Sequence, residues 1–211
     1  KYWDVSFDLQ SPAPDREEAA IELVERLREA VRIRLIAEVP LGAFLSGGVD
    51  SSSVVAMMAQ VSHEPVNTCS IAFDEAAYDE SSYAAAVAEK FGCRHNVDTV
   101  DPGDHSLLDL MAGIYDEPFA DSSCIPTYRV CELAKRRVTV VLSGDGGDEA
   151  LAGYRRHRWH MLEEKVRSPL PGFIRAPVFG MLGRLYPKMD WAPKVLRAKT
   201  TFQAIARDSL S

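Results

Sequence analysis

The sequence lacks the features that mark several common protein classes. Its 211 residues contain no apolar run long enough to span a membrane and no signal peptide. Basic residues are fewer than acidic ones: the chain has 24 Lys and Arg and 31 Asp and Glu, which gives a net charge of -7. Because binding to a nucleic-acid backbone requires a basic face, we do not expect nucleic acid as a partner. Without a membrane span or a signal peptide, we expect a cytoplasmic protein with no membrane partner.

Cysteine and histidine are also sparse, and neither shows a diagnostic spacing. The four cysteines form no CxxC pair, and the five histidines do not cluster as metal ligands do. We therefore interpret the cysteines as small buried side chains in a reducing compartment, without a disulfide or a zinc site. The GxxxxGK[ST] phosphate loop is absent as well, which excludes the commonest phosphate-binding loop.

What the sequence does contain is a glycine-rich turn, Ser-Gly-Gly-Val-Asp-Ser-Ser at 46–52, between an apolar run and a run with helical spacing. Glycine lets the backbone approach a ligand, and Ser51 and Ser52 can cap the helix that follows. The free N–H groups and the dipole at that helix start attract an anion, usually phosphate. Asp50 would repel phosphates unless a cation lay between, so it predicts Mg2+.

A second glycine-rich turn, Ser-Gly-Asp-Gly-Gly-Asp-Glu at 143–149, follows the β-branched run 138–142. Both turns come after strands, and ligands of parallel sheets bind at the carboxyl ends of the strands. We therefore expect both turns to face one cleft, with backbone donors and aspartates suited to a polyphosphate and a divalent metal. The alternative, in which Gly146 and Gly147 merely close a tight turn, does not explain the three acids at Asp145, Asp148 and Glu149.

Hydrophobic periodicity predicts an alternation of helices and strands. We expect helices at about 16–37, 51–60, 79–91, 106–115, 126–137 and 154–166, and strands at 39–45, 66–73, 95–100 and 138–142. Asp15 is expected to cap the first helix. This order predicts an α/β fold, a doubly wound parallel sheet with helices on both faces.

Three regions are expected along the chain. They are a linker at 1–14, a nucleotide-binding domain at 15–165, and the start of a helical C-terminal region at 166–211. In the last region, proline breaks the stretch Ser168–Pro177, and short helices are expected at 178–185 and 202–207.

Taken together, the motifs resemble the synthetase domain of glutamine-hydrolysing asparagine synthetases, members of the N-type ATP pyrophosphatase superfamily. Besides the two turns, the resemblance includes Tyr-Trp-Asp at 2–4, Val-Pro-Leu-Gly at 39–42, Asp-Glu-Pro at 116–118, Ala-Asp-Ser-Ser at 120–123 and Gly-Tyr at 153–154. It implies an adenine nucleotide alpha-hydrolase-like fold. It also implies a ligase that adenylates the β-carboxylate of aspartate and releases pyrophosphate, after which ammonia attacks to give asparagine and AMP.

Two other interpretations are compatible with the same residues. β-Lactam synthetases and peptide-cyclising relatives have similar turns, so the carboxylate that is adenylated can differ. The chain can also be an ATP-binding fragment without complete catalysis.

The resemblance also implies roles for individual residues. ATP would be held by Leu45, Ser46, Gly47, Gly48, Asp50, Ser51, Ser52, Ile71, Ser143 and Gly144. The Mg2+ ligands would be Asp50 and Asp148, and the catalytic acids Asp145 and Glu149. Asp145 stands where the family often has glutamate. Asp121 and Ser122 are implied near the amino-acid substrate.

Two departures from the family pattern lead to expectations about this chain. The family's glutaminase domain begins with a nucleophilic cysteine, whereas residue 1 here is Lys1, so we expect no glutamine hydrolysis. The family's catalytic lysine has no match and is expected beyond residue 211, which suggests a fragment of a larger enzyme. The expected partners are ATP, aspartate and ammonia from a glutaminase domain absent here, with a homodimer as one assembly.

Overall fold

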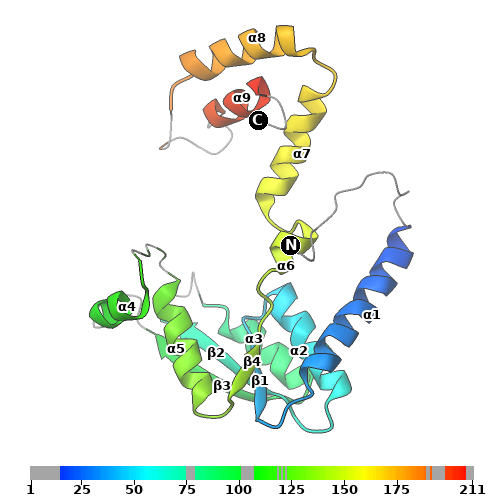
Figure 1. Ribbon diagram of the computed structural model, residues 1–211, viewed down its shortest axis with the longest axis vertical. Helices are drawn as coiled ribbons and strands as arrows, with labels where there is room; N and C mark the ends of the chain where they lie inside the picture. Colours follow the sequence, from blue (N-terminus) through cyan, green and yellow to red (C-terminus); the bar gives the residue numbers. More distant parts are fainter. Residues whose placement is uncertain are drawn as a thin grey trace. The chain divides into compact units, whose positions relative to one another are not determined.

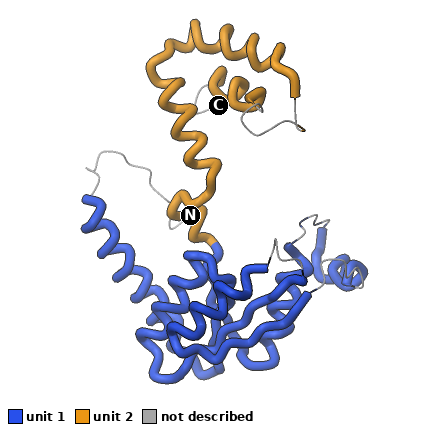
Figure 2. The backbone as a smooth tube through the Cα atoms, turned by 180° about the vertical axis from the view of Figure 1, so that it is seen from behind, with its two compact units in different colours: residues 1–145 blue, residues 146–211 orange. Residues whose placement is uncertain are grey.

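The computed structural model describes residues 15–74, 79–100, 107–117, 119, 121, 123–188, 191 and 198–207. The chain forms two compact units, residues 1–145 and 146–211 (Figure 2). A compact unit is not by itself a domain, so the predicted boundary at residue 165 stays a prediction. The predicted linker at 1–14 lies outside the described residues. Among the described residues, no helix combines the length and the apolar character needed to cross a membrane.

The first unit contains a four-stranded parallel sheet (Figure 1). Its elements are α1 (Arg16–Arg34), β1 (Leu41–Phe44), α2 (Val49–Val61), β2 (Asn67–Phe73), α3 (Ser81–Lys90), β3 (Arg94–Val100), α4 (Leu108–Ile114), α5 (Cys124–Lys135) and β4 (Val140–Leu142). The strand order is β3-β2-β1-β4, and every neighbouring pair is parallel. In the register of the sheet, Gly42 of β1 lies between Asn67 of β2 and Val141 of β4.

Two separate apolar cores cover the two faces of the sheet. Residues of α1, α2 and α3 build the first core on one face, with Val31, Ala43, Leu45, Val54, Val55, Met57, Met58, Val66, Ala84 and Ala88 buried in it. The second core, on the other face, contains Cys69 with three residues at the end of α5 and beyond, namely Leu133, Ala134 and Val138. Successive strand residues point to opposite faces, so Ala43 joins the first core and Phe44 packs against the second. This arrangement confirms the predicted doubly wound parallel sheet.

Helix α1 begins as predicted and ends earlier. The Asp15 carboxylate caps it by accepting a hydrogen bond from the Glu17 N–H at 3.0 Å. Val31 is buried and Leu35 packs beside it, but Val24, seven residues before Val31 and so on the same side of the helix, is exposed. The described part of the unit therefore covers only the C-terminal half of this helix.

The described residues of the second unit form helices joined by turns and no strand, as predicted. It contains α6 (Gly147–Leu151), α7 (Arg155–Arg167), α8 (Gly172–Leu185) and α9 (Lys199–Ala206). The expected break up to Pro177 is wrong, because α8 continues through this residue. Proline removes one helical hydrogen bond there. Tertiary packing offsets that loss, since Phe179 and Tyr186 place their rings 6.3 and 5.4 Å from the ring of Phe202 on α9.

Two buried arginines hold the C-terminal end of α9. Arg175 donates to the carbonyl oxygens of Ile205 at 3.1 Å and Arg207 at 2.6 Å. Arg167 donates to the carbonyl of Ala204 at 2.9 Å. The last carbonyls of a helix have no partner within the helix, so the two guanidinium groups supply the missing donors.

Candidate functional site

The first glycine-rich turn joins β1 to α2 and requires glycine at its centre. Gly47 has φ of +82°, and a Cβ there would lie 2.5 Å from the Tyr83 Cβ and 2.7 Å from the Ala84 backbone nitrogen. The left-handed backbone and the close approach of α3 thus both exclude a side chain. Gly48 has more room, since an added Cβ would meet Ser46 Oγ at 3.3 Å and nothing else within 4 Å.

Serine hydroxyls fix the shape of this turn. Ser51 Oγ accepts a hydrogen bond from the Ser46 N–H at 3.2 Å and lies 2.9 Å from Ser46 Oγ, which in turn accepts from the Gly48 N–H at 3.2 Å. The expectation that Ser51 and Ser52 cap the helix is wrong, because α2 already begins at Val49 with Gly48 as its cap. Ser51 therefore lies inside the first turn of the helix and holds the loop from there.

The start of α2 has polar groups without hydrogen-bond partners in the described part of the chain. The Ser52 hydroxyl oxygen is buried and has no hydrogen-bond partner within the described part of the chain. Gly48 offers no side chain to the first N–H groups of the helix. An orphaned hydroxyl beside an uncapped start of a 13-residue helix is a suitable place for an anion.

The second turn begins directly against the first. A Cβ on Gly144 would lie 2.5 Å from the Ser51 backbone nitrogen and 2.7 Å from the Asp50 carbonyl carbon. Only glycine lets the end of β4 approach the start of α2 so closely. At this residue the second turn lies directly against the first.

The two turns meet where the direction of the sheet reverses. From β1 the chain continues to β2 and β3 on one side, whereas β4 pairs with β1 on the other side. Such a switch point opens a crevice at the carboxyl ends of the strands, where doubly wound sheets bind ligands. The topology therefore places the predicted residues at 45–52 and at 143–144 around one crevice.

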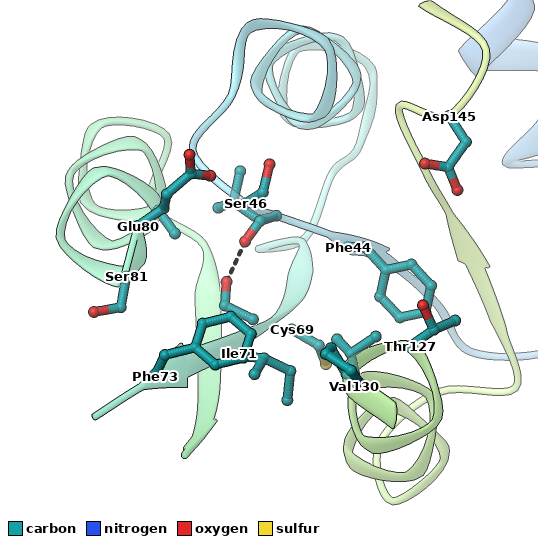
Figure 3. Close-up of a pocket in the computed structure, with 14 residues that line it drawn as sticks. Phe44, Ser46, Cys69, Ile71, Phe73, Glu80, Ser81, Thr127, Val130 and Asp145 are labelled. Atoms are coloured by element: carbon teal, nitrogen blue, oxygen red, sulfur yellow. Dashed lines mark hydrogen bonds between the residues drawn. The ribbon is translucent and has the colours of Figure 1, made fainter. Parts of the chain in front are cut away.

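A pocket of about 290 Å³ lies beside the turns (Figure 3). Residues from β1 and the first turn, from β2, from the start of α3, from α5 and from the second turn line it: Phe44, Leu45, Ser46, Cys69, Ser70, Ile71, Phe73, Glu80, Ser81, Ala84, Pro126, Thr127, Val130 and Asp145. Four of the predicted site residues are among them: Leu45, Ser46, Ile71 and Asp145. Its apolar, partly aromatic wall and its few polar groups are typical of a small-molecule site.

Sequence reasoning missed the contributions of α3 and α5 to this pocket. A signal was present, since Glu80 and Ala84 are four residues apart, as are Pro126 and Val130, and residues with this spacing share one face of a helix. Nothing in the sequence indicates that these faces meet the crevice.

Two of the predicted acids in the first unit are engaged locally. Asp145 accepts a hydrogen bond from the Ser143 hydroxyl at 3.0 Å, and its own N–H donates to that oxygen at 3.2 Å. Asp121 accepts from the Ser123 N–H at 2.8 Å, and hydrogen bonds from this serine lower the pKa of Asp121. The other predicted substrate residue, Ser122, lies outside the described residues.

The second unit carries Asp148 and Glu149 on α6. The Tyr154 hydroxyl donates to Glu149 Oε1 at 2.5 Å, which lowers the pKa of Glu149 and raises that of Tyr154. The guanidinium of Arg156 lies 4.4 Å from the centre of the Tyr154 ring. Asp148 packs over Gly153, where an added Cβ would come within 1.9 Å of Asp148 Oδ1. The roles of both acids stay predictions.

The residues of the first turn are compatible with Mg2+. Within the described ranges there is no cluster of three or more His, Cys, Asp or Glu that could hold a metal by itself. Mg2+ commonly needs only one or two carboxylates, because substrate phosphates and water complete its shell. Asp50, in the first turn of α2, meets that requirement.

Comparison with known proteins agrees with this geometry. The family model described as asparagine synthase matches residues 22–210. The chain belongs to the asparagine synthase family. The match includes both glycine-rich turns and every described residue that lines the pocket.

Relatives in the asparagine synthase family are much longer than this chain. It is 43% identical over 176 residues to "Putative asparagine synthetase [glutamine-hydrolyzing] 2" of Methanocaldococcus jannaschii, covering 82% of this chain and 33% of that protein. It is 35% identical over 142 residues to "Asparagine synthetase [glutamine-hydrolyzing] 1" of Bacillus subtilis, covering 65% of this chain and 22% of that protein. It is 33% identical over 185 residues to "Amidase chyE" of Penicillium rubens, covering 79% of this chain and 28% of that protein. The chain thus spans a third or less of each relative.

Proposed function

We propose that this chain is the synthetase part of an ATP-dependent ligase that forms asparagine. The β-carboxylate of aspartate would attack the α-phosphate of ATP, forming β-aspartyl-AMP and releasing pyrophosphate. Ammonia, supplied by a glutaminase domain of the complete protein, would then attack the acyl carbon and release AMP. The observation that carries the proposal is the contact of Gly144 with Asp50 and Ser51, which joins the two glycine-rich turns of an asparagine synthase family chain beside a pocket.

The chemistry requires an anion to attack another anion, which costs energy unless fixed charges and dipoles compensate. The open start of α2, the Ser52 hydroxyl and the backbone around Gly48 are proposed to hold the pyrophosphate. Mg2+, held by Asp50 and Asp148, would neutralise phosphate charge. The pairing of these two carboxylates rests on the family resemblance.

The nucleoside is proposed to occupy the pocket. Leu45 and Ile71 would contact adenine, and the backbone of Ser143 and Gly144 would follow the ribose. Asp145, on the pocket wall, and Glu149 are proposed as catalytic acids, with Asp121 and Ser122 near aspartate. The free cysteines suit a reducing compartment, so we place the enzyme in the cytoplasm. The assembly of the chain as a homodimer stays a prediction.

Mg-ATP binding to the chain and to Asp50→Ala tests this assignment. Ligand at about a hundred times its dissociation constant should stabilise the folded chain by about 2.7 kcal/mol, seen as a rise of a few degrees in the midpoint of thermal unfolding. We expect Asp50→Ala to lose most of this rise and Glu89→Ala, an exposed acid on α3, to keep it. An unchanged rise in Asp50→Ala would show that the metal assignment is wrong.

A second candidate keeps the site and changes the carboxylate that is adenylated. The similarity to a protein named as an amidase favours testing it. Pyrophosphate exchange measured with a panel of amino acids should respond to aspartate if the first proposal holds. Exchange with another carboxylate would support the second candidate, and Mg-ATP binding without any exchange would leave a nucleotide-binding fragment.

A further inference from the structure

The chain leaves β1 through a peptide group that a side chain of β2 holds. The backbone pairing of the two strands ends at Phe44 and Cys69, and beyond it the Leu45 N–H donates to the Cys69 carbonyl at 3.0 Å. The next hydrogen bond is made by the Ser70 hydroxyl, which donates to the Leu45 carbonyl oxygen (Figure 3, dashed line). The last carbonyl before the first glycine-rich turn is therefore oriented by a residue of the neighbouring strand.

Burial makes this hydrogen bond important for the local structure. Ser70 is 4% exposed and Leu45 is 1% exposed, so water does not readily replace either partner. A buried carbonyl group without a donor costs free energy. Without the Ser70 hydroxyl, the Leu45 carbonyl would have to turn toward another donor or toward solvent.

The orientation of this carbonyl also fixes the first N–H of the turn. The Leu45 carbonyl and the Ser46 N–H belong to one planar peptide group, so they rotate together. The Ser46 N–H donates to Ser51 Oγ at 3.2 Å, and Ser51 Oγ lies 2.9 Å from Ser46 Oγ, which accepts from the Gly48 N–H at 3.2 Å. One peptide group is thus held at its oxygen by Ser70 and at its nitrogen by Ser51.

We infer that Ser70 is a positioning residue for the first glycine-rich turn, residues 46–52. It fixes the peptide group between Leu45 and Ser46, and through Ser51 it keeps the turn in the shape that receives phosphates. This inference rests on the proposed ATP site and adds to it a residue that lies outside both glycine-rich turns. If the hydroxyl is lost, the turn must be ordered when the ligand binds, and the cost of that ordering lowers the affinity.

Exchange of the Ser46 amide proton, followed by NMR without ligand, tests the structural half of the inference. The hydrogen bond to Ser51 Oγ protects this proton in the unmodified chain. We expect exchange to be at least about tenfold faster in Ser70→Ala, because local opening of the turn costs less free energy there. Ser70→Thr retains a hydroxyl and should restore the protection.

Calorimetric titration of Mg-ATP tests the consequence for the site. We expect Ser70→Ala to weaken binding about tenfold, and Ser70→Thr to bind within about threefold of the unmodified chain. Thermal unfolding of each variant without ligand reports whether the fold is retained.

Thr68→Val is the matched control for the loss of a buried hydroxyl. Thr68 is 0% exposed and lies two residues earlier on the same face of β2, but its hydroxyl lies 2.9 Å from His95 Nδ1 and makes no contact with the turn. This variant should bind Mg-ATP as the unmodified chain does, even if its stability falls.

The outcomes separate this inference from the function on which it rests. If Ser70→Ala leaves either the Ser46 exchange rate or Mg-ATP binding unchanged, the inference is wrong and the ATP site stands. Equal weakening of binding in Ser70→Ala and Thr68→Val would assign the loss to reduced stability and overturn the inference. If the unmodified chain does not bind Mg-ATP, the proposed function fails, whereas the Ser46 exchange rates still decide whether Ser70 orders the turn.

Discussion

Gly47 and Gly48 are neighbours in the sequence, yet the structure constrains them differently. Gly47 combines φ of +82° with a site where an added Cβ would lie 2.5 Å from Tyr83 Cβ. We expect Gly47→Ala to lower the free energy of unfolding by at least about 2 kcal/mol, from backbone strain together with overpacking. Urea unfolding followed by circular dichroism measures this change.

Gly48 provides the matched comparison at the same scale. Its φ of -66° is open to any residue, and an added Cβ would meet only the movable Ser46 hydroxyl at 3.3 Å. Gly48→Ala should therefore stay within about 1 kcal/mol of the original stability. If Gly47→Ala and Gly48→Ala lowered the free energy of unfolding equally, strain and overpacking at Gly47 would not explain its effect.

At the scale of elements, Gly144 sets the distance between the end of β4 and the start of α2. An added Cβ would lie 2.5 Å from the Ser51 nitrogen and 2.7 Å from the Asp50 carbonyl carbon, and backbone atoms cannot turn aside. We expect Gly144→Ala to destabilise the chain by about 1–3 kcal/mol and to weaken Mg-ATP binding at least tenfold, because the two turns must separate. Urea unfolding and calorimetric titration measure the two effects.

Gly113 in α4 is the control for this prediction, because an added Cβ there meets nothing within 4 Å. Gly113→Ala should leave Mg-ATP binding unchanged. If Gly144→Ala bound Mg-ATP as the original chain does, the contact between β4 and α2 would not be needed for the site.

At the scale of the whole molecule, the titrating groups predict a loss of stability in acid. Burial lowers the pKa of His95 from its ordinary value of 6.5, so the unfolded chain takes up this proton before the folded chain does. The free energy of unfolding therefore decreases as the pH falls below 6.5 and through the folded pKa. Hydrogen bonds from Ser81 lower the pKa of Asp79 from 3.8, and its contribution is lost in the same direction at lower pH.

Urea midpoints measured at pH 7.5, 6.5 and 5.5 check this dependence. His95→Gln should flatten the decrease between pH 6.5 and 5.5, because the buried imidazole that resists protonation is gone. His63→Gln, at an exposed position, is the control and should keep the original slope. A slope unaffected by His95→Gln would assign the dependence to other groups.

Local patterns in the sequence were sufficient to predict the order of helices and strands and both glycine-rich turns. Periodicity and glycine chemistry depend on residues close together in the chain, which is why the strand predicted at 66–73 and the observed β2 (Asn67–Phe73) nearly coincide. The family motifs added the predicted nucleotide, the predicted catalytic acids Asp145 and Glu149, and the predicted metal ligands Asp50 and Asp148. The roles of these residues stay predictions.

Tertiary structure alone decided which side chains meet at the pocket. Glu80 and Val130 come from helices whose sequences do not reveal which face is covered, and they line the pocket only because α3 and α5 pack near the carboxyl ends of the strands. Pro177 stays within α8, although its local propensity is to break a helix. In each case contacts between residues far apart in the chain outweigh the local preference, and a sequence read along its length does not contain those contacts.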